Sequence, residues 1–143
     1  AEAIQRAVMD AMPAIEASLN TIKAMGNQHG YVVTIAGRPL SIPQYVNKRT
    51  GRQEYAGYKG QNYTVQGSAY DQLADTMGRG YEAGLAGTCR LAMHDEVVVD
   101  NEAADEWRRL MMVPSPALCR AVDRTPVLRT DMVDMGIRWT KPE

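Results

Sequence analysis

The first thirty residues carry apolar side chains at spacings of three and four, the pattern of an amphipathic helix that lies on a core. Pro13 interrupts this stripe. Because proline removes a backbone hydrogen bond and clashes with the preceding turn, we expect a kink or two helices that meet near Met12. Gly26 and Gly30 bracket the predicted helix end. The stripe consists of Ile4, Val8, Met12, Ile15, Leu19 and Ile22.

The segment YVVTIAGRPLSIP, residues 31–43, is rich in β-branched residues around a Gly-Arg-Pro break and predicts a short hairpin. A loop rich in basic residues follows. Helical spacing returns over residues 61–84, where Asn62 and Gln66 are four apart and therefore share one helix face. The apolar stripe of this second helix is expected to be Val65, Ala69, Leu73 and Met77.

Two apolar runs, residues 88–93 and 97–100, predict strands on either side of the triplet His94-Asp95-Glu96. The candidates for buried positions on these strands are Leu91, Met93, Val97 and Val99. A helix over about 102–112 is expected to turn inward Ala103, Trp107, Leu110 and Met111. Pro114 and Pro116 then break the chain, and residues 125–139 predict a last strand.

The order of these elements favours one α+β domain over residues 1–143, with helices on one face of a small antiparallel sheet. A length of 143 residues and a hydrophobic content of 45% are enough for one globular core. No apolar run approaches the roughly 20 residues of a membrane helix, and no signal segment opens the chain. We therefore expect a soluble protein of the cytoplasm with no membrane partner.

Two remaining features of the chain bear on its setting. Cys89 and Cys119 have neither CxxC nor zinc-ligand spacing, which favours reduced packing thiols. The chain also enters helical spacing at Ala1 without a capping residue. We expect it to be a fragment of a longer protein.

Charge is distributed unevenly, although the formal net charge is only −1. Between residues 38 and 59 the sole acid is Glu54, and the bases are Arg38, Lys48, Arg49, Arg52 and Lys59. Residues 95–106 hold six acids and no base. A polyanion could therefore dock on the first segment and a cation on the second.

The triplet at residues 94–96 allows two interpretations. Taken alone, His-Asp-Glu is most often a solvated turn, because aspartate favours turns and charged tips avoid burial. On a rigid apolar hairpin, neighbouring carboxylates are also oxygen ligands suited to Mg²⁺ or Mn²⁺. Asp71 and Asp75 supply no obvious second ligand cluster, since they are expected to be solvated or to interact with the helix dipole. With only His29 and His94, a hydrolase that needs several histidine ligands is disfavoured.

Three ordered motifs, YVVTIAGRPLSIP, NYTVQGSAYD and LAMHDEVVVD, together resemble the C-terminal palm portion of family A DNA polymerases, the bacterial polymerase I type. The helix containing Pro13 and the closing DMGIRW are similar to the flanking segments, so the resemblance covers nearly the whole chain. It implies that Asp95 binds the catalytic metal ions, Glu96 supports that site, and His94 faces the primer terminus. It further implies that Asn62 and Gln66 contact the duplex; the alternatives are a helix N-cap and a surface amide.

This sequence departs from the family pattern in several places. Tyr58 stands where the family commonly has an arginine that contacts the duplex. The next residue, Lys59, is expected to contact a phosphate instead, but a lysine cannot make the two parallel hydrogen bonds of an arginine. Ala69-Tyr70 replaces a common alanine pair. The family's second metal-binding aspartate and its fingers helix have no counterpart in these 143 residues.

The resemblance implies a DNA polymerase that uses primer-template DNA, dNTPs and two Mg²⁺ or Mn²⁺ ions, in a bacterial cell or a phage-infected host. An upstream polymerase segment, in cis or in trans, is expected to complete the site, and the chain alone is expected to be inactive. One alternative is a non-catalytic relic that binds nucleic acid or a partner chain, with homodimerisation through its exposed surface. Another, a small phosphohydrolase built on the turn alone, suffers from the same shortage of ligands.

Overall fold

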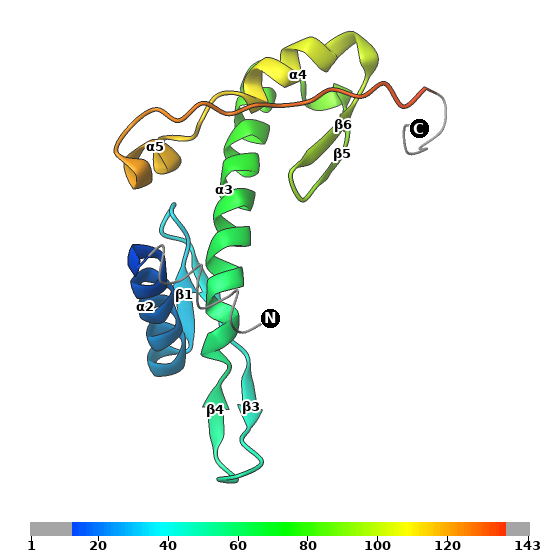
Figure 1. Ribbon diagram of the computed structural model, residues 1–143. Helices are drawn as coiled ribbons and strands as arrows, with labels where there is room; N and C mark the ends of the chain where they lie inside the picture. The colour runs from blue at the N-terminus through cyan, green and yellow to red at the C-terminus, as the bar shows by residue number, and fades with distance from the viewer. Residues whose placement is uncertain (1–12, 137–143) are drawn as a thin grey trace. The chain divides into compact units, whose positions relative to one another are not determined.

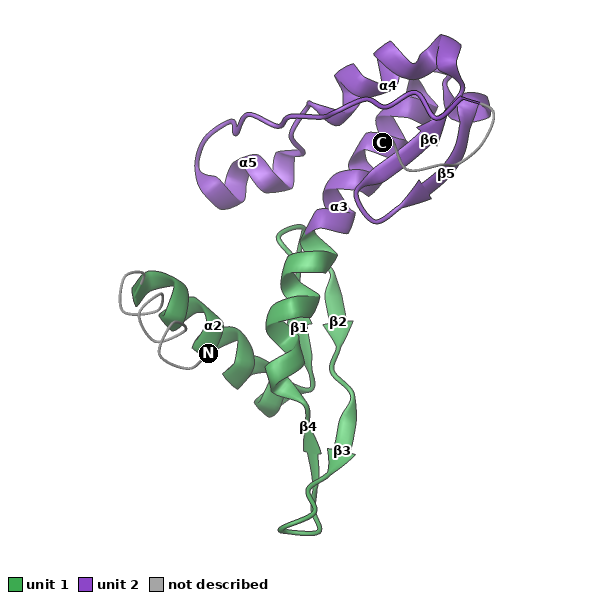
Figure 2. Cartoon of the chain, turned by 45° about the vertical axis from the view of Figure 1, so that its right-hand side comes forward, with its two compact units in different colours: residues 1–68 green, residues 69–143 purple. Residues whose placement is uncertain are grey.

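The computed structural model describes residues 13–136. The chain divides into two compact units, residues 1–68 and residues 69–143 (Figure 2), and each is described by itself. The helix α3, Gly60–Glu82, passes from the first unit into the second. Among the described residues, no helix has the combination of length and apolar character that a bilayer crossing requires.

The first unit opens with α2, Pro13–His29 (Figure 1). The expected kink near Met12 lies outside the described residues. Gly26 lies inside the helix rather than at its end. A Cβ at Gly26 would come within 3.1 Å of the Gly57 Cα, so glycine here allows close backbone packing. The helix ends at His29 and is followed by Gly30, which has a φ of 72° and whose N–H donates to the Gly26 carbonyl at 3.1 Å.

Two hairpins follow α2. The predicted hairpin is confirmed: β1, Tyr31–Val33, pairs antiparallel with β2, Pro39–Ser41. The basic segment is a second hairpin, in which β3, Gln44–Val46, pairs with β4, Gln53–Tyr55. The expectation of a plain loop there is wrong, because turn-forming residues between Asn47 and Gly51 reverse the chain between two short strands.

The core of the first unit centres on Val32, Ile42 and Ala56. The predicted second helix is confirmed as α3, preceded by a 3-10 turn at Gly57–Lys59. Its predicted apolar stripe is wrong at Val65 and Ala69, which are exposed, whereas Leu73 is buried and Met77 half-buried. The physical reason is that α3 approaches the β1–β2 hairpin through small residues: a Cβ at Gly67 would lie 2.5 Å from Leu40 Cδ1.

The second unit contains a hairpin and two short helices. A 3-10 turn, Ala86–Thr88, leads into β5, Cys89–Met93, which pairs with β6, Glu96–Val99. After a further 3-10 turn at Asn101–Ala103 come α4, Ala104–Met111, and α5, Pro116–Val122. The inward residues predicted for α4 are confirmed: Ala103 and Trp107 are buried, and Leu110 and Met111 are half-buried.

Two expectations for the C-terminal segment are wrong. Pro116 begins a helix instead of breaking the chain, because the Ser115 hydroxyl caps α5 by accepting the Leu118 N–H at 3.2 Å. Residues 125–136 form no strand and pair with none of the described strands; residues 137–139 lie outside the described part.

The α+β class is confirmed, but the sheet is divided. Within residues 13–136 there are three two-stranded antiparallel sheets, one for each hairpin, rather than one small sheet. The single domain over residues 1–143 stays a prediction. Cys89 and Cys119 are half-buried and form no disulfide, in agreement with the predicted thiols.

Candidate functional site

The predicted acidic turn is present at the tip of the β5–β6 hairpin. Met93 pairs with Glu96, which leaves His94 and Asp95 as the two residues of the turn. His94 has a φ of 55°, the left-handed value that a two-residue hairpin needs at its first central position and that histidine tolerates better than most residues. All three side chains are exposed. Glu96 therefore belongs to β6, one residue beyond the turn proper.

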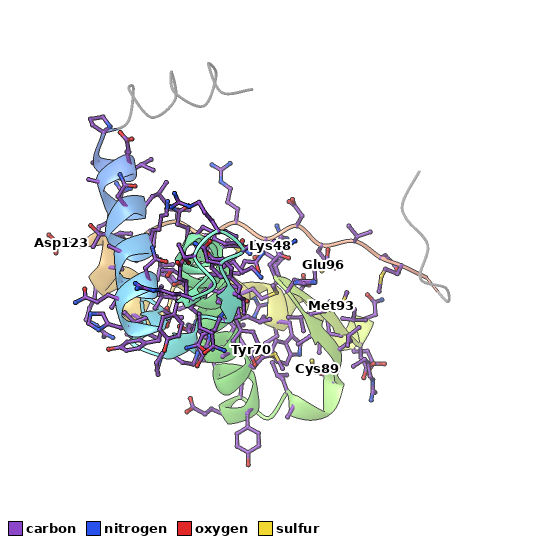
Figure 3. The ribbon with its side chains drawn as sticks, turned by 90° about the horizontal axis from the view of Figure 1, so that it is seen from below. Lys48, Tyr70, Cys89, Met93, Glu96 and Asp123 are labelled. Carbon is purple, nitrogen blue, oxygen red and sulfur yellow. The ribbon has the colours of Figure 1, made fainter. Side chains whose placement is uncertain are left out.

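The pairing register decides which face of the hairpin each side chain occupies. Because Met93 is directly opposite Glu96 and Leu91 is opposite Val98, these four share one face (Figure 3 labels Met93 and Glu96). Val97 lies opposite Ala92 and so projects from the other face, as does Val99. The predicted buried set was therefore wrong: Leu91 and Met93 are 39% and 41% exposed, while Val97 and Val99 are half-buried.

The base of the same hairpin carries an ion pair. The Arg90 guanidinium donates to both oxygens of the Asp100 carboxylate, at 2.9 and 2.6 Å. These hydrogen bonds lower the pKa of Asp100 and raise that of Arg90. Asp95, in contrast, has no hydrogen bond or ion pair to any residue between 13 and 136. Its carboxylate therefore remains available to a cation from outside.

The turn offers the kind of donor atom that a divalent cation prefers, but it offers too few of them. Exposed carboxylate oxygens of Asp95 and Glu96 are suitable ligands for Mg²⁺ or Mn²⁺. Over the described ranges, however, no group of three or more histidine, cysteine, aspartate or glutamate side chains is arranged to hold a metal ion. This hairpin can thus supply part of a coordination shell.

Asp71 and Asp75 do not form a second metal site. Asp75 pairs with Arg79, whose guanidinium also donates to the Leu110 and Val113 carbonyls at 3.3 and 2.9 Å. Both aspartates lie well inside α3 and both are half-buried, so the expectation that they are solvated or interact with the helix dipole is wrong. The Asp75–Arg79 pair instead ties α3 to the end of α4.

The two amides predicted to contact DNA lie on one exposed face of α3 in the first unit. Asn62 and Gln66 are one turn apart, and neither side chain makes a hydrogen bond to another described residue. Asn62 follows the start of the helix at Gly60 and caps nothing, so the N-cap alternative is wrong and the surface-amide description holds. Tyr58, one turn before Asn62, and Lys59 are exposed as well.

The predicted basic residues divide into two groups. Arg38 lies in the turn between β1 and β2, and its guanidinium donates to the Gly67 carbonyl at 3.0 Å. It therefore holds the first hairpin against α3. Lys48, Arg49 and Arg52 are all exposed in the loop between β3 and β4.

A polar network at this second hairpin was missed by the sequence reasoning. The Glu54 carboxylate accepts hydrogen bonds from the Asn47 amide at 2.9 Å, the Tyr45 hydroxyl at 3.1 Å and the Thr50 hydroxyl at 3.4 Å. The bond from Asn47 is the largest cause of a lowered pKa at Glu54, and the bond to Glu54 raises the pKa of Tyr45. The available signal was the turn sequence from Asn47 to Gly51, flanked by Tyr-Val and Glu-Tyr.

Comparison with known proteins defines the class of the chain. The family described as DNA polymerase family A matches residues 1–139, so the chain belongs to that family. Two relatives agree: the chain is 28% identical over 108 residues to the DNA polymerase of Mycobacterium phage L5, and 29% identical over 109 residues to the DNA polymerase I of Rhizobium leguminosarum. No solved structure gives a significant match.

The matched regions are a small part of these relatives. They cover 76% and 72% of this chain but only 16% of the phage polymerase and 11% of the bacterial polymerase I. The chain is therefore related to one segment of much longer polymerases.

Proposed function

We propose that the chain is the C-terminal palm portion of a DNA polymerase, and that its β5–β6 turn supplies carboxylate ligands to a two-cation active site. The observation that carries the proposal is the combination of family membership with an exposed His94-Asp95 turn whose carboxylate has no partner among the described residues. An acid kept solvated and uncompensated on a rigid hairpin is suited to bind a cation that arrives with substrate.

The proposed reaction is template-directed nucleotidyl transfer. The primer 3′-hydroxyl oxygen bonds to the α-phosphorus of a dNTP, the bond to the leaving oxygen breaks, and pyrophosphate departs with the electron pair. Mg²⁺ or Mn²⁺ ions held in part by Asp95 would lower the pKa of the attacking hydroxyl and would neutralise charge on the leaving group. Asp95 would hold a cation, Glu96 would strengthen the negative potential beside it, and His94 would face the primer terminus.

The α3 face would bind the DNA duplex. Asn62 and Gln66 are exposed amides with free donors and acceptors, which suits them to contact sugars and base edges near the growing end. Lys59, one residue beyond Tyr58, would reach a phosphate. Sequence-independent affinity would come from further phosphate contacts by Arg38, Lys48, Arg49 and Arg52.

We further propose that the site needs polypeptide from an upstream polymerase segment, in cis or in trans. One hairpin tip offers too few ligands for two cations about 4 Å apart, since that arrangement usually draws on separate segments. The 143-residue chain alone would then bind DNA without extending it. Such an enzyme would act in the cytoplasm of a bacterium or a phage-infected cell.

Primer extension tests this function. The purified chain is incubated with primed template, dNTPs and Mg²⁺, alone and with the upstream segment of the Rhizobium polymerase I, the matched relative. We expect no extension by the chain alone, extension by the mixture, and none by a mixture that carries Asp95→Asn. Extension by the isolated chain would contradict the incomplete site, and full activity of Asp95→Asn would contradict the role of Asp95.

A non-catalytic partner-binding role is favoured by one observation, the exposure of Leu91 and Met93 together on one face of the β5–β6 hairpin. Exposed apolar side chains on a two-stranded sheet are suited to bind another chain that would bury them. Light scattering separates the two roles: this alternative expects a stable homodimer of the chain that Leu91→Lys dissociates, together with no extension in any mixture.

A further inference from the structure

The β3–β4 hairpin is an arm of the first unit. It extends past the N-terminal end of α3, away from α2 (Figures 1 and 2), and all three residues of β3 are exposed. Among the described residues, the hydrogen bonds of its loop, residues 47–52, have both partners within residues 47–54. The loop is therefore ordered by the hairpin itself, whereas Tyr55 on β4 packs against the core of the first unit.

The loop at the end of this arm is ordered by Asn47. The Asn47 N–H donates to the Arg52 carbonyl at 2.9 Å, and the Asn47 carbonyl accepts from Gly51 at 2.8 Å. Its side-chain oxygen accepts the Arg49 N–H at 2.9 Å, and Gly51 has a φ of 69° that a side chain would disfavour. The backbone that carries the three basic residues is thus preorganised.

The charge at the loop is positive and uncompensated by ion pairs. Lys48 (labelled in Figure 3), Arg49 and Arg52 make no ion pair within residues 13–136, and Glu54 is the only acid between residues 38 and 59. The Glu54 carboxylate is already occupied by its three hydrogen bonds. Three cations against one acid leave the loop with a surplus of two positive charges, which attracts a polyanion.

The hairpin that carries these cations also carries an exposed aromatic ring. Tyr45 is the cross-strand partner of Glu54 and donates its hydroxyl to that carboxylate, so the ring is fixed in orientation while 45% exposed. Tyr58 is 63% exposed and lies close enough to Tyr45 to raise its pKa electrostatically. The surface defined by Tyr45, Tyr58 and the loop cations, here called the arm surface, combines stacking platforms with positive charge.

We propose that the arm surface binds an unpaired nucleic-acid strand, with the loop cations on its phosphates and the ring of Tyr45 stacked on a base. A duplex offers its phosphates but keeps its base faces stacked on one another, whereas a single strand offers both. The proposal rests on the polymerase function only for its setting, in which the strand would be the single-stranded part of a template. The chemistry of the surface stands by itself.

Fluorescence anisotropy in EDTA tests the stacking component. The full 143-residue chain is titrated with a labelled short oligothymidylate and, separately, with a blunt duplex. We expect Tyr45→Leu to weaken binding of the single strand roughly fivefold, near the low end for one stacked base, and to leave duplex binding unchanged. Tyr45→Phe, which keeps the ring and loses only the hydroxyl, and Tyr81→Leu, at an exposed tyrosine of the second unit, should both bind as the parent does.

A salt titration tests the charge component. The slope of log affinity against log salt for the single strand should fall in magnitude by about 2 when Lys48, Arg49 and Arg52 are all changed to alanine, near 0.7 for each phosphate contact. The matched control removes three exposed arginines from the second unit, Arg108, Arg109 and Arg120, and should leave the slope unchanged.

Several results would overturn the proposal. These are absence of binding by the parent chain, equal losses on single strand and duplex for Tyr45→Leu, a parent-like affinity for that variant, or the same loss of slope in the control triple variant. Circular dichroism checks that each variant is folded. Asp95→Asn should bind the oligothymidylate normally in EDTA, so failure of the arm surface and failure of the cation site give different results.

Discussion

The indole nitrogen of Trp107 donates a hydrogen bond to the Thr88 hydroxyl at 3.0 Å, and this bond joins α4 to the base of the β5–β6 hairpin. Trp107 is 1% exposed. The Thr88 hydroxyl in turn donates to the Leu85 carbonyl at 2.7 Å, and the Thr88 carbonyl accepts the Asp100 N–H at 2.9 Å. The hairpin that presents Asp95 is therefore held at its base by a buried tryptophan.

Gly80→Ala should destabilise the second unit. A Cβ at Gly80 would overlap the six-membered ring of Trp107, which is buried and has no space to retreat. We expect a loss of about 1–3 kcal/mol in the free energy of unfolding, the usual range for overpacking, measured by urea denaturation.

The matched control is Gly78→Ala, two residues earlier in the same helix. A Cβ at Gly78 would meet nothing within 4 Å, so only the helix propensity changes. We expect a gain of about 0.5–1 kcal/mol. Equal effects of the two substitutions would contradict the close packing of Trp107 on α3.

Gln72 should be nearly as sensitive as Gly80. Its side-chain oxygen accepts the N–H of buried Ser115 at 2.7 Å, and its amide nitrogen donates to the Val113 carbonyl at 3.0 Å. Gln72→Leu leaves the buried Ser115 N–H without a partner, at a cost of about 1–3 kcal/mol in urea denaturation, while the Val113 carbonyl keeps its hydrogen bond from Arg79. Gln66→Ala, an exposed amide on the same helix, should change stability by less than about 0.5 kcal/mol. A parent-like stability for Gln72→Leu would contradict this bridge.

Glu54 should make the stability of the β3–β4 hairpin depend on pH. Its pKa in the folded chain is lowered from 4.5, mainly by the hydrogen bond from Asn47. A carboxyl group whose pKa is lower in the folded chain than in the unfolded chain stabilises the folded state when it is ionised. The stabilisation from Glu54 is therefore complete at neutral pH, and it is lost as the pH falls below 4.5 and through the pKa of the folded chain. The protection factor of the Gly51 amide, which is its intrinsic exchange rate at each pH divided by the observed rate, should therefore fall below pH 4.5.

Glu54→Gln is the control for this pH effect. The neutral amide cannot titrate, so the protection factor of the Gly51 amide in the variant should lack this fall below pH 4.5. The same fall in the protection factor in the variant and the parent would assign the effect to another acid.

The α3 face gives a prediction about duplex DNA. Asn62→Ala and Gln66→Ala together should weaken binding of a primed duplex, because each removes an exposed amide that is free to donate and accept. The slope against salt should stay unchanged, since neither residue carries a charge. Gln53→Ala, an exposed amide on β4, is the matched control. Undiminished duplex affinity of the double variant would exclude this face.

The sequence predicted the elements whose signals are local. The β1–β2 hairpin, α3, α4 and the acidic turn are where their patterns placed them, because β-branched runs, helical spacing and turn residues act over a few positions. The family motifs added the class of protein and the proposed ligand Asp95, which no periodicity could have indicated.

Burial was harder to predict than the elements themselves. The stripe through Val65 failed because α3 packs through Gly60 and Gly67, and glycine leaves no hydrophobic signal. The prediction that Leu91 and Val97 are buried together was wrong because a two-residue turn puts them on opposite faces of the hairpin. Which face a residue occupies depends on the strand register and not on composition. The prediction of a plain loop at residues 44–55 was also wrong. The hairpin there depends on side-chain hydrogen bonds to Glu54 from residues up to nine positions away.

Manganese binding tests the central claim, that the β5–β6 turn contributes a cation ligand through Asp95. The chain, its Asp95→Asn variant and the control Asp105→Asn, at an exposed acid on α4, are titrated with Mn²⁺ and free ion is measured by electron paramagnetic resonance. We predict weak binding by the parent and by Asp105→Asn, and its loss in Asp95→Asn. Binding by Asp95→Asn equal to that of the parent would contradict the account.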